Sequence, residues 1–309
     1  VVDTPVVDAA KAIAFTANLD NLKGGSGDDS FNGVYYANGG TGTTAFPGDS
    51  VDGGAGADTL NISVAGLSTA AVSINAIRTS NVETVLVTNY DTNATAGQDT
   101  TIDTSLMSGI VNVGLNASSA VGDTIFTGMT SIVGASMANG SGDLTLTYTA
   151  TPIAGTADTQ TVTVSNVTAG TFTANGAETI AIDTSLAKST LTNVASDTLK
   201  TLDIGGDQAL TISTALTNTT IDASDNTGGV TLTLGANAAH VVTGGSGADT
   251  IDAVGTLSST DTMTGGAGSD VLKLKVGAAT IDKGDATTKG ELYNVTGFET
   301  VDIAATADT

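Results

Sequence analysis

The chain has 309 residues, and its 32 acidic side chains outnumber 9 basic ones to give a formal charge of −23. This charge argues against nucleic acid as a partner, because proteins bind phosphate backbones through cationic side chains. No run of about 18 apolar residues is present, so membrane insertion is not expected. The absence of cysteine excludes disulfide and thiolate chemistry.

The first distinctive elements are two glycine-rich blocks, GGSGDDSF at 24–31 and GGAGADTL at 53–60. Both fit the nonapeptide G-G-x-G-x-D-x-U-x, in which U is apolar, a pattern typical of calcium-binding parallel β-rolls. Glycine allows the backbone of a tight turn to present its carbonyl groups. The aspartate adds a carboxylate, and calcium takes six to eight such oxygen ligands. The apolar eighth residue is expected to begin a short strand and to point into the roll.

A second phrase occurs three times, as NVETV at 81–85, GAETI at 176–180 and GFETV at 297–301. A catalytic glutamate would not usually be present in three copies. We therefore interpret the Glu-Thr phrase as a repeated structural unit.

Residues 100–235 contain many short segments rich in Val, Ile, Leu and Thr, separated by Asn, Asp and Gly. Their spacing of about 8–12 residues is typical of stacked solenoid turns or of a sandwich, and we favour the solenoid. Segments 143–149 and 161–165 are predicted to form an inserted hairpin. Helix should be scarce, because no long 3.6-residue periodicity occurs.

Two further full matches lie near the carboxyl terminus, GGSGADTI at 244–251 and GGAGSDVL at 265–272. The competing interpretation, four flexible Gly-Ser turns, does not explain why Asp and an apolar residue recur at fixed offsets. Weaker units at 44–52 and 256–264 keep Asp49 and Asp261 in the aspartate position. Successive turns of a roll alternate sides, so the two complete turns of each module are expected to stack on each other.

These patterns predict one calcium site between 24–29 and 53–58 and another between 244–249 and 265–270. The predicted carboxylate ligands are Asp29, Asp58, Asp249 and Asp270, with Asp28, Asp49, Asp252 and Asp261 as weaker candidates. The predicted backbone ligands are Gly25, Gly27, Gly54, Gly56, Gly245, Gly247, Gly266 and Gly268.

No enzyme is predicted. His240 is the only histidine, and it occupies the aspartate position of the nonapeptide frame that precedes Gly244. A turn residue that caps the roll explains it better than a general base or a metal ligand. No G-x-S-x-G element is present, and zinc motifs with two histidines are impossible.

The glycine-rich blocks resemble those of the RTX family of calcium-binding secreted proteins. Together with phrases such as LKTLDIGGDQALTIST at 199–214, they are most similar to RTX-type bacterial surface-layer proteins. This resemblance implies an all-β, calcium-stabilised parallel β-roll or β-solenoid, type I secretion and a location on the cell surface. It also implies lateral assembly of identical subunits bridged partly by Ca²⁺, with a cell-surface polysaccharide as a second partner.

The predicted organisation has three parts. Residues 1–88 form an amino-terminal calcium module, 89–235 a divergent middle solenoid and 236–309 a carboxyl-terminal calcium module. The leading hypothesis is a structural, self-assembling extracellular protein, either a surface-layer subunit or a filament. The alternatives are an adhesin stalk and the non-catalytic RTX part of a secreted protease or lipase.

Overall fold

Short strands dominate the chain because threonine and other polar residues alternate with apolar residues, many of them valine and isoleucine, that face a core. A computed structural model describes residues 8–37, 41–67, 70–91, 99–217, 220–235, 239–253, 257–285 except 277–281, 287 and 290–305. All regular elements in these ranges are strands. Within them, no helix is long and apolar enough to cross a membrane.

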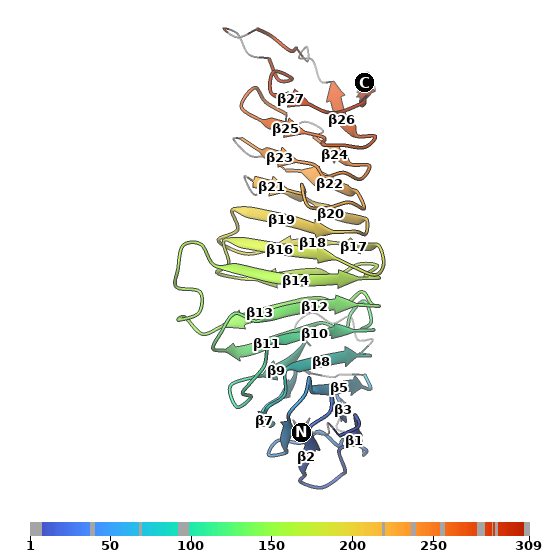
Figure 1. Cartoon of the computed structure of the whole chain (residues 1–309), viewed down its shortest axis with the longest axis vertical. Coiled ribbons are helices and arrows are strands. Elements are labelled where there is room, and N and C mark those ends of the chain that lie inside the picture. Colours follow the sequence, from blue (N-terminus) through green and yellow to red (C-terminus); the bar gives the residue numbers. More distant parts are fainter. Residues whose placement is uncertain are drawn as a thin grey trace, which may run out of the picture. The chain divides into compact units, whose positions relative to one another are not determined.

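The chain divides into two compact units, and the first comprises Val1–Gly155 and Gly170–Asn175. Its strands form three parallel ladders, with the orders β1-β3-β5-β8-β10-β12, β2-β4-β7 and β6-β9-β11-β13-β15 (Figure 1). Their bounds are β1 Ala12–Ala14, β2 Asn21–Gly25, β3 Ser30–Tyr36, β4 Ser50–Gly54, β5 Thr59–Ala65, β6 Val72–Ile74, β7 Arg78–Ser80, β8 Thr84–Asn89, β9 Thr100–Asp103, β10 Asn112–Asn116, β11 Thr124–Met129, β12 Gly134–Ala138, β13 Leu144–Tyr148 and β15 Thr171–Ala174.

The second unit comprises Thr156–Ala169 and Gly176–Thr309. Two parallel ladders run through it, β14-β16-β19-β21-β23-β25-β27 and β17-β20-β22-β24-β26-β28. Their bounds are β14 Thr159–Ser165, β16 Thr179–Thr184, β17 Ser189–Leu191, β19 Thr201–Gly206, β20 Leu210–Leu216, β21 Thr220–Asp222, β22 Val230–Leu234, β23 Val241–Thr243, β24 Thr250–Asp252, β25 Thr262–Thr264, β26 Val271–Val276, β27 Val295–Thr296 and β28 Thr300–Ala305; β18 spans Asn193–Ala195.

Each unit is a solenoid whose strands stack in register on those of the next coil. In the first unit Phe31 of β3 pairs with Leu60 of β5, and in the second Ile251 of β24 pairs with Leu272 of β26. All four of these eighth-position residues are fully buried. The prediction of an all-β parallel β-roll or solenoid is therefore confirmed, and so is the inward direction of the apolar residue.

The predicted hairpin is wrong. Segment 143–149 contains β13, which pairs in parallel with β11 and β15, and segment 161–165 falls in β14, which pairs in parallel with β16. The reason is the burial of one face of each strand, with Leu144 and Leu146 in β13 and Val162 and Val164 in β14. Such a face must stack on neighbouring coils to leave water, whereas an inserted hairpin would expose it.

Candidate calcium site

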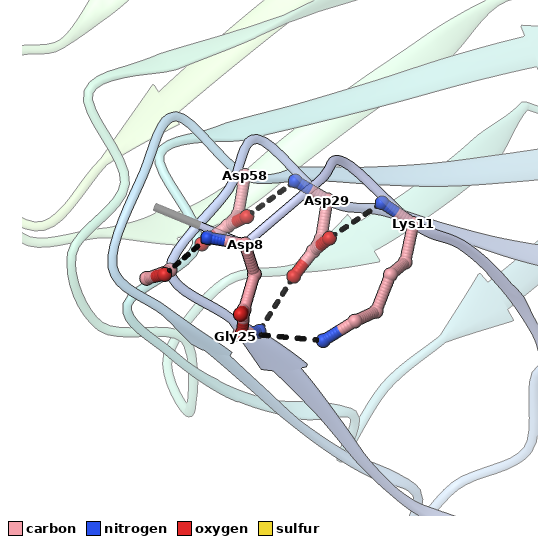
Figure 2. A network of polar contacts seen from close by, with 6 residues as sticks. Asp8, Lys11, Gly25, Asp29 and Asp58 are labelled. Atoms are coloured by element: carbon pink, nitrogen blue, oxygen red, sulfur yellow. Dashed lines mark hydrogen bonds and ion pairs between the residues drawn. The ribbon is translucent and has the colours of Figure 1, made fainter. Parts of the chain in front are cut away.

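The two complete turns of the amino-terminal module are joined by aspartate side chains (Figure 2). Oδ1 of Asp29 accepts a hydrogen bond from the backbone nitrogen of Lys11 at 2.7 Å, and Oδ2 accepts one from Gly25 at 2.6 Å. The backbone nitrogen of Asp29 donates in turn to Oδ1 of Asp58 at 2.7 Å. Each carboxylate thus spans from its own turn to the preceding coil.

The carboxyl-terminal module repeats this arrangement. Asp249 accepts hydrogen bonds from the backbone nitrogens of Val230 at 2.7 Å and Gly245 at 2.8 Å. Its own backbone nitrogen donates to Oδ1 of Asp270 at 2.8 Å. The structure therefore brings together Asp29 with Asp58, and Asp249 with Asp270, as the stacking of first and third turns predicts.

The predicted glycines also meet in pairs across these turns. A Cβ atom added to Gly56 or Gly268 would overlap the carbonyl group of the glycine in the preceding turn, and both residues have positive φ, 128° and 133°. No other residue adopts this backbone in so narrow a space without strain. The pairs in contact are Gly25 with Gly54, Gly27 with Gly56, Gly245 with Gly266 and Gly247 with Gly268.

One oxygen atom in each module lacks the partner that burial demands. Among the described residues, Oδ2 of Asp58 and Oδ2 of Asp270 are buried and accept no hydrogen bond. An unpaired buried carboxylate oxygen is costly unless a proton or a cation satisfies it. Both atoms lie in the third turn of their module, the turn whose glycines contact those of the first turn.

The same burial shows in the acidity of these groups. Burial raises the pKa of Asp58 above its ordinary 3.8, and the nearby charges of Glu83, Asp29 and Asp28 raise it further against the hydrogen bond from Asp29. Burial likewise raises the pKa of Asp249, and the charge of Asp270 adds to this effect. A divalent cation would relieve both the desolvation and the repulsion.

The ligand set fits calcium because it is made of oxygen atoms. No group of three or more His, Cys, Asp and Glu side chains converges within the described residues. Each candidate site offers two carboxylates, so its remaining ligands would come from backbone carbonyl groups of the glycine turns. Calcium accepts such mixed and irregular oxygen coordination, which magnesium tolerates poorly.

The weaker candidates Asp49 and Asp261 lie on the other side of the coil, and the structure identifies their partners. Asp49 accepts hydrogen bonds from the backbone nitrogens of Asp20 at 2.9 Å and Phe46 at 2.6 Å. Asp261 accepts them from His240 at 2.7 Å and Ser258 at 2.6 Å. Both carboxylates are buried.

His240 occupies the stacking position opposite Asp261, where the nonapeptide frame places it. It is fully buried, and its Nε2 lies 2.9 Å from the carbonyl oxygen of Gly235. The imidazole therefore lies among the stacked turns of the roll, in the same column as Asp261.

The remaining two candidates lie outside the pair of stacked carboxylates. Asp28 is exposed and accepts a hydrogen bond from the backbone nitrogen of Ala57 at 2.8 Å, so it links two turns from outside. Asp252 lies in β24, opposite Lys273 of β26. It follows the buried Ile251 and faces away from the core, not into the glycine turn.

The role of the Glu-Thr phrase becomes visible only in the structure. Glu83 and Glu299 occupy the position of the aspartate in the next coil, and each accepts a 2.7 Å hydrogen bond through Oε2, from Asp58 and Asp270 respectively. Glu178 does the same for Asp158 at 3.0 Å. The spacing gave no signal, because the separation varies from 25 residues between Asp58 and Glu83 to 20 between Asp158 and Glu178 and 29 between Asp270 and Glu299.

The stacked parallel coils, glycine turns and carboxylate columns define a calcium-binding β-roll. Four segments match the RTX calcium-binding nonapeptide repeat, at residues 17–33, 48–61, 241–253 and 257–274. They include all four complete blocks, so the chain contains RTX-type calcium-binding repeats and its cofactor is Ca²⁺. No curated protein and no solved structure matches the chain.

Proposed function

We propose that this chain is a structural, calcium-dependent, self-assembling protein of the cell surface, either a surface-layer subunit or an extracellular filament. The observation that carries this proposal is the pair of buried, unpartnered carboxylate oxygens of Asp58 and Asp270. Each lies in a stack of glycine turns that a bound cation would complete.

Calcium has two functions in this proposal. In the turns it neutralises the stacked aspartates. These are Asp29 and Asp58 in one module and Asp249 and Asp270 in the other. Across the surface it reduces the repulsion that a charge of −23 creates between copies. Extracellular calcium modules commonly bind with dissociation constants of about 10⁻⁴–10⁻³ M. The chain would then remain unfolded inside the cell, in a state competent for type I secretion, and it would fold outside the cell.

The matched repeats are calcium-binding modules without a catalytic function, and no enzyme family matches the chain. That the chain as a whole is not an enzyme stays a prediction. So do the three-part division of the chain, the cell-surface polysaccharide and lateral contacts between identical subunits. A rigid stack of calcium-bound coils would equally suit an adhesin stalk or the RTX part of a secreted enzyme, so the experiment must separate these functions.

The test is a calcium titration of a chelated sample, followed by circular dichroism and negative-stain electron microscopy of the same fractions. A gain of β signal together with sheets or filaments supports the proposal. A gain of β signal with monodisperse particles supports calcium-dependent folding of the β-roll but favours an adhesin stalk over self-assembly. No response at about 10⁻³ M calcium, where extracellular modules are loaded, contradicts the calcium sites themselves.

A further inference from the structure

The coil that ends the second unit leaves part of the core face uncovered. Strand β28 pairs in parallel with β26, with Val301 beside Leu272 and Ile303 beside Leu274. Paired residues share one face of a sheet, and the two leucines are 0% and 1% exposed. Val301 and Ile303 are nevertheless 45% and 51% exposed, and among the described residues no strand pairs with the outer edge of β28.

The coil that begins the first unit has a matching edge. Strand β1 pairs with β3 alone among the described residues, with Ile13 beside Phe31. Phe31 is fully buried, whereas Ile13 on the same face is only half-buried. Within the part of the chain that the structure describes, β28 and β1 therefore each have an open strand edge and an apolar side chain in the core register.

The charges at the two edges are complementary. The position before each strand holds Lys11 before β1, Asp29 before β3, Asp270 before β26 and Glu299 before β28. Lys11 and Glu299 are both exposed and lie at the outer strands of two separate ladders, a cation before β1 and an anion before β28. Nζ of Lys11 also lies 3.8 Å from Oδ2 of Asp8 in an exposed ion pair. Inside the chain, successive coils join acceptor carboxylates to backbone donors at this position.

We infer that β28 of one copy binds β1 of a second copy as the next parallel strand, with Val301 beside Ile13 and Glu299 beside Lys11. This inference rests on the proposed function and names its interface. Because two different surfaces meet, the contact is head-to-tail and produces an open filament or a row within a sheet, not a closed dimer. Pairing of two β28 edges is disfavoured, since it would bring Glu299 and Asp302 of both copies together.

The first test uses cysteine pairs, which the cysteine-free chain allows without background. Full-length Val301→Cys and Ile13→Cys chains are mixed with calcium and oxidised. Adjacent strands lie about 4.8 Å apart, within disulfide reach, so we expect a linked heterodimer well above any Val301→Cys homodimer. A Val241→Cys chain is the control, because Val241 is also a 45% exposed valine but lies on the outer face of β23.

The second test measures assembly directly by sedimentation of Val301→Lys and Val241→Lys chains whose circular dichroism matches that of the original. A lysine at an open strand edge blocks strand addition. We expect Val301→Lys to lose most of the large species and Val241→Lys to retain them. Assembly that persists in Val301→Lys without the Val301–Ile13 crosslink overturns this interface and leaves the proposed function standing. An original chain that never assembles in calcium overturns both.

Discussion

The backbone nitrogen of Asp270 donates a 2.7 Å hydrogen bond to Oε2 of Glu299, 29 residues later in the chain. This contact continues the column that Asp249 and Asp270 begin, but with a longer side chain and no glycine block before it. A Glu-Thr phrase is thus the acceptor of the coil that follows a calcium turn. Glu83 has the same relation to Asp58 in the first unit, whereas the remaining phrase places Glu178 beside Asp158, outside the calcium turns.

Removing that acceptor should destabilise the carboxyl-terminal module. Glu299→Ala leaves the backbone nitrogen of the buried Asp270 without its side-chain acceptor, a loss of about 1–3 kcal/mol in the free energy of unfolding. Glu299→Gln retains an acceptor oxygen and should recover most of the loss. Urea unfolding monitored by circular dichroism measures both. The control is Glu291→Ala, because Glu291 accepts only a longer 3.2 Å bond in an exposed segment; an equal effect there would contradict a specific role of Glu299.

Removing the charge of Asp270 should weaken calcium binding by the second module while the fold survives. Asp270→Asn keeps an oxygen that can accept the bond from Asp249, yet it lacks the carboxylate that calcium prefers. We expect calcium affinity at this module to fall at least about tenfold, equivalent to about 1.4 kcal/mol. Isothermal titration calorimetry measures the affinity.

The matched control for this substitution is Asp252→Asn. Asp252 lies in the same module but faces outward beside Lys273, so its loss should leave calcium affinity unchanged. Equal losses in the two variants would show that general negative charge, and not the stacked pair, governs binding.

Stability should depend on pH in opposite directions with and without calcium. Burial raises the pKa of Asp58 and Asp249 above 3.8, so the folded chain binds more protons than the unfolded chain between that value and the raised one. The free energy of unfolding of the calcium-free chain therefore falls as pH rises through this window. In saturating calcium it should rise instead, because protons compete with the cation for the carboxylates.

Thermal unfolding across a pH series, in chelator and in calcium, measures this reversal. Burial also raises the pKa of Asp123, Asp143 and Asp203, so the original chain reports more than the two sites. The difference between the original chain and Asp58→Asn isolates one site. If that variant retains the full pH dependence in chelator, the assignment of the effect to Asp58 is incorrect.

The glycine turns should tolerate no side chain at their closest approach. Gly268 has φ of 133°, and a Cβ atom there would overlap Gly247, so Gly268→Ala should cost more than about 1 kcal/mol and weaken calcium binding. Gly205→Ala is the control, since its nearest neighbour to a new Cβ would be 3.7 Å away. Similar unfolding midpoints for the two variants would contradict tight stacking of the turns.

Local pattern was sufficient to predict the calcium turns. Asp and an apolar residue at fixed offsets after glycines predict a turn and a strand start, and Asp29, Asp58, Asp249 and Asp270 all lie where the repeat places them. The hairpin at 143–165 failed for a physical reason. Two strands close in sequence can pair with each other or stack on different coils, and only the burial of Leu144, Leu146, Val162 and Val164 decides between these outcomes.

The sequence by itself determined the β-roll, its cation and the glycines that permit it, because a nine-residue pattern specifies each turn and the start of each strand. Only the tertiary structure decided which residues the carboxylates outside the two stacked pairs meet. Asp49 faces Asp20, Asp261 faces His240, and Glu83 and Glu299 end the columns, across separations of 21 to 29 residues. Loop length sets those separations but leaves no sequence motif. The partners can therefore be identified only when the coils are stacked.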